Sequence, residues 1–215
     1  RDDVESRGLG DVYKRQDEIH CDLTKPGTEY IPFASVDDTC RDISVTCIAP
    51  TKTFNLAGLQ TAAVYAENSI LHHRMWRQLN TDEVAEPNAF AIQATIAAFQ
   101  YGEEWLDELR EYVEKNKQYV TEFLQEKIPL IHPVAGDATY LMWLDCRKIT
   151  ESGRQFVKFI RKTSGLYVSG GNQYGRGGEG FLRVNVATSK LVVEDGMQRL
   201  YESVDAWLKE EKISK

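Results

Sequence analysis

The sequence lacks the features of a membrane-bound, secreted or nucleic-acid-binding protein. No apolar run approaches the roughly 18 residues that a membrane-spanning helix needs. Acidic residues outnumber basic ones by 33 to 26, so the net charge is −7 and a broad phosphate-binding surface is missing. The four cysteines include no C-x-x-C pair, which is typical of reduced thiols. We therefore expect a soluble, cytoplasmic protein with no nucleic-acid or membrane partner.

Signatures of nucleotide and metal sites are also missing. The glycine-rich stretch 170–180 (GGNQYGRGGEG) is not a G-x-G-x-x-G that opens a helix, so it predicts a flexible loop. Histidine and cysteine are not spaced as further ligands around Asp17 and His20. The sequence therefore predicts no metal site.

Residues 1–16 (RDDVESRGLGDVYKRQ) show no apolar periodicity and lack the layout of a secretory signal. Residues 11–16 (DVYKRQ) resemble the translation of a transposase adapter used in sequencing libraries. We interpret 1–16 as a non-native tail joined to a truncated gene, with a natural disordered tail as the alternative. The first interpretation implies that no strand precedes Asp17.

The rest of the chain alternates between strand-like and helix-like segments, after an irregular loop that extends to about residue 33. Strands are predicted over 43–49, 61–66, 139–144, 166–169 and 181–187, and helices over 69–80, 86–101, 103–126, 154–163 and 190–209. This alternation predicts an α/β protein. We place a domain boundary near residue 110, with a larger piece over 17–110 and a compact one over 111–215.

A lysine directly follows the first buried strand, in the stretch APTKTFNLAGL (49–59). Hydroxyl residues flank Lys52, and small residues follow it. This position could desolvate the amine yet leave it reachable, which favours attack on a carbonyl. The alternative is a solvated lysine in a polar turn.

Two further elements carry candidate chemistry. Asp17 and His20 form a D-x-x-H pair that could serve as an acid–base pair or as cofactor partners, or could simply be loop residues. Arg183 interrupts the apolar strand FLRVNVA (181–187), and its planar fork suits a carboxylate. The alternative is an edge-strand arginine paired with a local glutamate.

Taken together, these segments resemble the C-terminal half of fold-type I pyridoxal-phosphate (PLP) enzymes of the class I/II aminotransferase family. Within that family they are most similar to the MalY/PatB group of cystathionine β-lyases. The resemblance covers nearly all of 17–210 and rests on segments that stand in the family's order: DEIHCDL (17–23), APTKTFNLAGLQ (49–60), NAFAIQATIAAF (88–99), EEWLDELREYVEKN (103–116), TYLMWLD (139–145) and GFLRVNVA (180–187).

The resemblance implies a role for each candidate residue. Lys52 corresponds to the lysine that binds PLP covalently and then moves the Cα proton, and Asp17 to the carboxylate that pairs with the pyridinium nitrogen. His20 lies where the family places a group near the phenolic oxygen, and Arg183 where it binds the substrate carboxylate. The role implied for Thr51, beside Asn55 and Lys52, is phosphate binding. Asn88, near the start of its helix, is expected to contribute to the neighbouring subunit's site in a homodimer.

One departure concerns the phosphate. Many aminotransferases carry a phosphate-binding arginine eight residues after the lysine, where this chain has Gln60. The family's phosphate turn, ring-stacking aromatic residue and several sheet strands come from a first half that these residues do not include. The implied fold is thus a truncated fold type I, with a remnant of the large-domain sheet over 17–110 and the small α/β domain over 111–215.

The implied function is a PLP-dependent C–S β-lyase that acts on cystathionine or related S-substituted cysteines. An aminotransferase of the same fold is the first alternative. The second is a non-catalytic binding or regulatory protein, or an inactive fragment.

Overall fold

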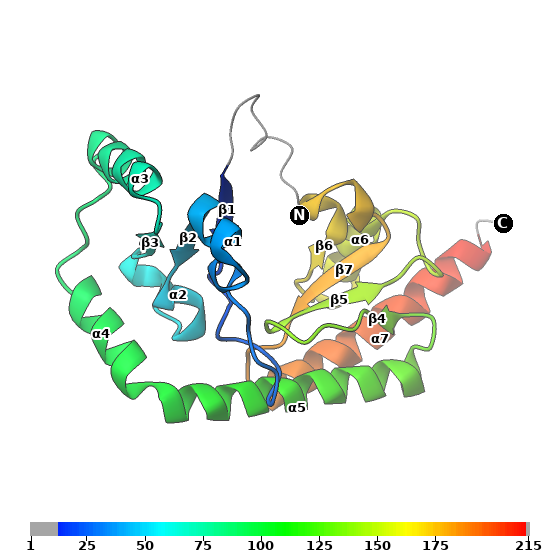
Figure 1. Ribbon diagram of the computed structural model, residues 1–215. Coiled ribbons are helices and arrows are strands. Elements are labelled where there is room, and N and C mark those ends of the chain that lie inside the picture. Colours follow the sequence, from blue (N-terminus) through cyan, green and yellow to red (C-terminus); the bar gives the residue numbers. More distant parts are fainter. Residues whose placement is uncertain (1–12, 214–215) are drawn as a thin grey trace. The chain divides into compact units, whose positions relative to one another are not determined.

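The computed structural model describes residues 13–213. The chain divides into two compact units between Glu108 and Leu109, here called unit 1 and unit 2. The break falls within the long helix α5 (Glu103–Lys127), which begins in unit 1 and ends in unit 2 (Figure 1).

Unit 1 is built on a three-stranded sheet in the order β1-β2-β3. The strands are β1 (Lys14–Asp17), β2 (Ser44–Ile48) and β3 (Ala63–Tyr65). β1 is parallel to β2, whereas β3 is antiparallel to it. The β-branched run that predicts a buried strand over 43–49 forms β2, whose first three residues are buried.

β1 differs from the expectation that no strand precedes Asp17. Residues 14–16, placed in the tail by their sequence, form this strand with Asp17, and Lys14 lies opposite Ser44. Strand pairing uses backbone N–H and C=O groups that residues of any polarity carry, so the polar sequence KRQD can extend the sheet along β2. Residues 1–12 lie outside the described part of the chain, and the non-native origin of 1–16 stays a prediction.

Short helices and turns complete unit 1. They are η2 (Phe33–Ser35), α1 (Asp38–Ile43), α2 (Pro50–Thr53), η3 (Ala57–Leu59), α3 (Ser69–Thr81) and α4 (Ala91–Tyr101). Side-chain oxygens of Asp37 and Asn68 cap α1 and α3. The helix predicted over 86–101 begins only at Ala91, because Pro87 disfavours helical backbone at the residue before it and the Oδ1 of Asn88 accepts the N–H of Phe90.

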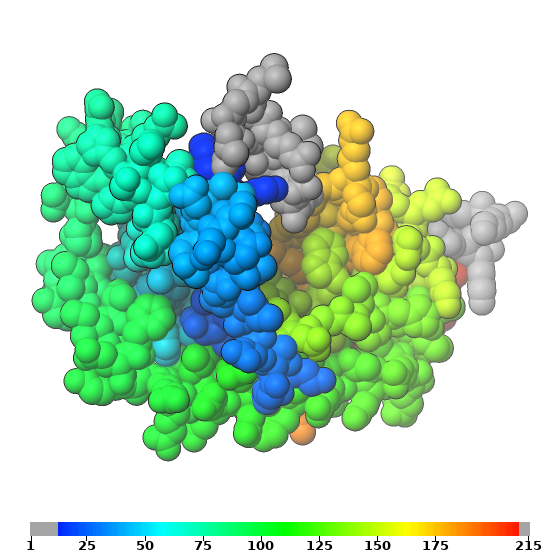
Figure 2. Space-filling model, in the orientation of Figure 1, coloured from blue at the N-terminus to red at the C-terminus, as the bar shows by residue number. Residues whose placement is uncertain are grey.

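Unit 1 leaves large apolar side chains open to solvent on α3 and α4. No residue of α3 is buried, and on α4 only Ala91 is. The exposed side chains are Ile70 and Trp76 on α3, and Ile92, Ile96, Phe99 and Tyr101 on α4. Figure 2 shows the outer surface of these helices in teal and green. Apolar exposure of this extent is typical of a surface that another polypeptide segment covers.

Unit 2 contains a four-stranded antiparallel sheet in the order β4-β5-β7-β6. Its elements are β4 (His132–Pro133), β5 (Leu141–Asp145), α6 (Gly153–Ser164), β6 (Ser169–Gly170), β7 (Phe181–Asn185) and α7 (Lys190–Ile213), besides the second part of α5. The strand predicted over 166–169 is therefore shorter and begins later.

The core of unit 2 lies on one face of this sheet. Alternate residues Met142 and Leu144 of β5, with Leu182 and Val184 of β7, are buried together with apolar residues of α5, α6 and α7. Figure 1 shows α7 and the second part of α5 along the same side of the sheet. The intervening side chains, Arg183 among them, therefore project from the opposite face.

The glycine-rich stretch 170–180 is an ordered turn rather than the flexible loop predicted from its composition. It forms two 3-10 turns, η4 (Gly171–Tyr174) and η5 (Arg176–Gly178). A Cβ on Gly171 would lie 2.3 Å from the carbonyl oxygen of Gly178 and 2.8 Å from the ring of Trp143. Glycine is thus required here by close packing.

Among residues 13–213, no helix is long and apolar enough to span a membrane. The same residues contain no group of three or more histidine, cysteine or acidic side chains placed to hold a metal. All four cysteines belong to this part of the chain, and none is paired in a disulfide.

We predict that Leu144→Ala destabilises unit 2 by about 2–5 kcal/mol, because it removes a fully buried side chain and leaves a cavity. Hydrogen exchange of the β5 and β7 amides measures this loss in unit 2 alone. Leu191→Ala is the matched control, since Leu191 is 76% exposed and its change should stay within about 0.5 kcal/mol. Equal effects of the two variants would contradict the described core.

Candidate active site

The first part of the candidate site lies at the carboxyl ends of two parallel strands. Asp17 is the last residue of β1 and lies opposite Cys47, the next-to-last residue of β2. The chain leaves β2 and enters α2, which carries Lys52, within two residues. Ligands of parallel α/β sheets bind beyond the carboxyl ends of the strands. The backbone therefore brings Asp17 and Lys52 to the same edge of the sheet.

Asp17 is exposed, and its carboxylate has one local hydrogen bond. Its Oδ1 accepts the backbone N–H of Ile19 at 3.3 Å, which orients the side chain at the turn that follows β1. Among the described residues no cation pairs with it. The carboxylate is therefore available to a cationic or N–H group of a ligand.

Lys52 projects from α2 between two buried neighbours. Thr51 and Thr53 are 9% and 0% exposed, whereas Lys52 is exposed. No hydrogen bond or ion pair to another described residue occupies its Nζ. The expected desolvation of this amine is wrong for the described chain, because no described element covers α2 at this position.

Pro50 explains why the helix begins where it does. Its fixed φ suits the first helical position, and the N–H of Phe54 closes the turn on its carbonyl oxygen at 2.9 Å. Phe54 then packs between α4 and α5, with ring centroids 5.6 Å from Phe99 and 5.7 Å from Trp105. A Cβ at Gly102 would come within 2.5 Å of the Phe54 ring. These contacts fix the turn that carries Lys52.

Two acidic residues of the DEIHCDL segment have structural roles that the sequence does not reveal. Asp22 accepts a hydrogen bond at 2.9 Å from the hydroxyl of Thr53. Glu18 is buried; its N–H donates to the carbonyl oxygen of Cys47 at 2.9 Å, and its carboxylate accepts the N–H of Phe33 at 3.1 Å. The loop after β1 is thereby tied to both β2 and α2. The only signal in the sequence is a second hydroxyl residue directly after Lys52.

The thiol and phenol beside these carboxylates are held protonated. Burial, with the nearby charge of Asp22, raises the pKa of Cys21 to about 11. Burial and the charge of Glu18 raise the pKa of Tyr30 to about 12. Because a thiol is a nucleophile only as the thiolate, Cys21 is not a candidate nucleophile at neutral pH.

His20 and Asn88 have local partners. His20 is half-buried in the turn after Asp17, and its carbonyl oxygen accepts the N–H of Leu23 at 3.0 Å. The Nδ2 of Asn88 donates to the carbonyl oxygen of Leu59, which joins the segment before α4 to η3. The roles of His20, Thr51 and Asn88 toward a cofactor stay predictions.

Arg183 belongs to unit 2. It lies on β7 with Trp143 of β5 and Ser169 of β6 as its strand neighbours, and its guanidinium carbon lies 4.1 Å from the centre of the Tyr174 ring. No carboxylate among the described residues forms an ion pair with it, so the alternative of an arginine paired with a local glutamate is wrong. An arginine without an acidic partner can bind the carboxylate of a ligand.

Comparison with known proteins identifies the family. The family model described as aminotransferase class I and II matches residues 16–200. The chain belongs to this family. The resemblance inferred from the sequence motifs is thereby confirmed.

Curated relatives and solved structures agree with this assignment. Cystathionine beta-lyase PatB of Bacillus subtilis is 40% identical over 184 residues, which cover 86% of this chain and 48% of the relative. Protein MalY of Escherichia coli is 29% identical over 88% of this chain and 48% of the relative. Cystalysin from Treponema denticola superposes with a TM-score of 0.87 at 27% identity, over 90% of this chain and 49% of its own.

The predicted fold type I is therefore confirmed. The chain spans about half the length of the curated relatives that it matches. The three-stranded sheet of unit 1 and the four-stranded sheet of unit 2 correspond to that matched half.

We predict that Thr53→Val weakens the attachment of α2 to the loop after β1 by about 1–3 kcal/mol, because it leaves the carboxylate of Asp22 without its donor. Hydrogen exchange at the Phe54 and Leu56 amides should accelerate accordingly. Thr61→Val is the matched control and should leave these rates unchanged. If Thr53→Val and Asp22→Ala add independently in a double-mutant cycle, the hydrogen bond does not have this role.

Proposed function

We propose that the whole protein containing this chain is a PLP-dependent C–S β-lyase, which converts cystathionine or related S-substituted cysteines to pyruvate, ammonia and a thiol. The observation that carries the proposal is the unpartnered amine of Lys52, located in the first turn after β2 at the sheet edge where Asp17 ends β1. The names of PatB and of the Staphylococcus hominis C–S lyase, which is 31% identical over 89% of this chain with a TM-score of 0.79, support the reaction class.

The residues present suit two parts of PLP. Lys52 offers a primary amine for its aldehyde, and Asp17 offers a free carboxylate for its ring nitrogen. For the phosphate the described residues offer less. Gln60, exposed in a left-handed turn after η3, replaces the cation that many relatives carry. The fit is therefore to the aldehyde and ring, and the phosphate contacts must come from residues outside this chain.

The bound cofactor supplies a protonated ring that accepts the electron pair left on the substrate's Cα. Asp17 keeps that ring nitrogen protonated through its negative charge. Lys52, once its amine is released by the substrate amino group, removes the Cα proton and holds it. Arg183 binds the α-carboxylate through its guanidinium fork.

The overall reaction balances with one water. The thiolate leaves from Cβ with the electron pair of the C–S bond and takes up a proton, and the remaining carbon skeleton adds water to give pyruvate and ammonia. Neither an oxidant nor a reductant is needed. An aminotransferase shares the loss of the Cα proton but returns a proton to the cofactor carbon instead, so the two activities differ only after this step.

We further propose that the whole protein is a cytoplasmic homodimer. The absence of disulfides among the described cysteines supports a reducing compartment. The exposed apolar side chains of α3 and α4 support a subunit contact.

Reduction with borohydride should attach the cofactor to Lys52. When the 215-residue chain is incubated with excess PLP and reduced, peptide mass spectrometry should locate the label on the peptide that contains Lys52. Binding is expected to be weak because the phosphate lacks its contacts. Lys52→Arg should remove the label, whereas Lys25→Arg should retain it. Equal labelling of several lysines, unchanged by Lys52→Arg, would reject the proposed anchor.

Product analysis distinguishes lyase from aminotransferase. In the whole protein, pyruvate release from cystathionine should exceed amino-group transfer from common amino acids to 2-oxo acids. Arg183→Ala should lower kcat/KM for either reaction by the equivalent of roughly 2–5 kcal/mol, as expected for a lost partner of a charge pair. Efficient transfer with negligible pyruvate would identify an aminotransferase instead.

A further inference from the structure

We infer that Tyr174 is a positioning residue, which holds the guanidinium of Arg183 in the plane where it binds the α-carboxylate of the substrate. The inference deepens the proposed function and rests on it. It concerns residues of unit 2 alone.

The geometry of the pair is the first support. The guanidinium carbon of Arg183 lies over the face of the Tyr174 ring, 4.1 Å from its centre. An aromatic face attracts the cation through its π electrons but does not consume the N–H donors, which lie in the plane of the guanidinium. A carboxylate partner would occupy the same donors that a substrate needs. The ring therefore orients the arginine and leaves its fork free.

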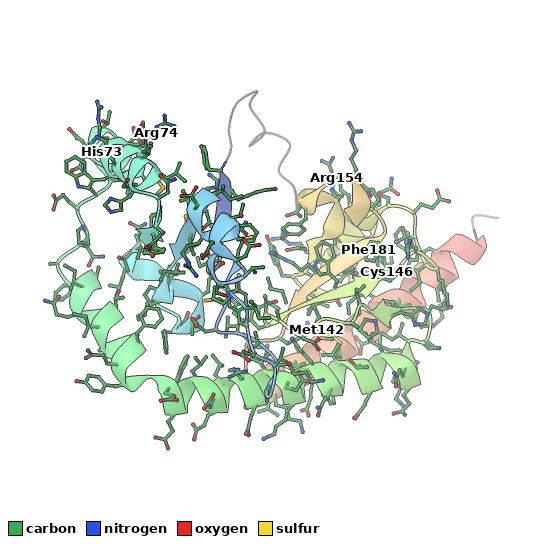
Figure 3. The ribbon with its side chains drawn as sticks, viewed as in Figure 1. His73, Arg74, Met142, Cys146, Arg154 and Phe181 are labelled. Carbon is green, nitrogen blue, oxygen red and sulfur yellow. The ribbon has the colours of Figure 1, made fainter. Side chains whose placement is uncertain are left out.

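The Tyr174 ring is itself fixed by its neighbours. The Trp143 ring meets it nearly perpendicularly, with centroids 5.5 Å apart, and a second edge contact links Trp143 to Phe181 at 6.1 Å. The guanidinium of Arg147 covers the Phe181 ring at 4.9 Å. Figure 3 marks Phe181 at the start of β7. Arg183 thus stands at the end of a continuous row of aromatic contacts.

The end of this row is anchored by charge. Arg147 pairs with Asp145, with Nη2 and Oδ2 2.6 Å apart and Nε 2.9 Å from Oδ1. This bidentate pair lowers the pKa of Asp145 to about 2, so the carboxylate stays ionised through the physiological range. The one carboxylate at this end of β5 is therefore committed to Arg147.

The backbone holds Tyr174 against this row. Gly171 and Gly178 approach so closely that a Cβ on Gly178 would lie 2.0 Å from the carbonyl oxygen of Gly171. The two 3-10 turns can therefore pack against each other and against Trp143 only with glycine at these positions. The glycine-rich stretch has a specific task, which is to bring the Tyr174 ring under Arg183.

Nuclear magnetic resonance of the 215-residue chain tests the stacking directly. The ring current of Tyr174 should shift the side-chain proton signals of Arg183 upfield, and Tyr174→Leu should abolish that shift while Tyr174→Phe retains it. The matched control is Tyr167→Leu, since Tyr167 lies under Arg161 at 4.7 Å in the same unit. An Arg183 signal unchanged by Tyr174→Leu would overturn the inference.

Kinetics of the whole protein test the consequence. Tyr174→Leu should raise KM for cystathionine about tenfold, with a smaller change in kcat, because an unrestrained arginine must be ordered when the carboxylate binds. Tyr174→Phe should restore KM to within about twofold. A Tyr174→Phe variant as impaired as Tyr174→Leu would overturn the inference, because the ring face would then not be what matters.

The two failures can be told apart. If Lys52 is not labelled and no pyruvate forms, the proposed function fails whatever happens at residue 174. If both are observed and KM does not respond to Tyr174→Leu, only the positioning role fails. The amide spectrum of β5 and β7 shows whether each variant keeps the sheet of unit 2.

Discussion

The chemistry of unit 1 depends on the parallel pairing of β1 with β2. This pairing alone brings Asp17, which is far from Lys52 in the sequence, to the edge of the sheet at which α2 begins. A one-residue shift in register would turn every side chain of β1 to the other face. Glu18 and Asp22 then secure the loop that follows, through Cys47, Phe33 and Thr53. Stability and chemistry are therefore provided by adjacent residues of one short segment.

Unit 2 solves a different problem, which is to keep an arginine ordered but unneutralised. Its core occupies one face of the sheet, and Arg183 projects from the other because alternate strand residues point to opposite faces. Tyr174 supplies a flat surface for the guanidinium in place of a counter-ion. The aromatic row behind it and the close glycine contacts give that surface its rigidity.

The sequence predicts the features that depend on local pattern. Amphipathic periodicity locates α3, α5, α6 and α7 closely, and β-branched residues locate β2. It does not predict β1, since KRQD pairs through its backbone and has no apolar pattern. The bond between Asp22 and Thr53 and the stack of Arg183 on Tyr174 depend on tertiary proximity, which local patterns do not encode. Family motifs identify Lys52, Asp17 and Arg183 without revealing these supports.

The central claim is that Asp17 and Lys52, at neighbouring strand ends, hold one and the same cofactor. The most direct measurement is the nitrogen-15 chemical shift of the ring nitrogen in the whole protein loaded with labelled PLP. The account predicts a protonated ring nitrogen in the wild type and an unprotonated one in Asp17→Ala, at a pH where the free ring is unprotonated, with the cofactor still attached to Lys52. A ring nitrogen that stays protonated in Asp17→Ala would contradict the account.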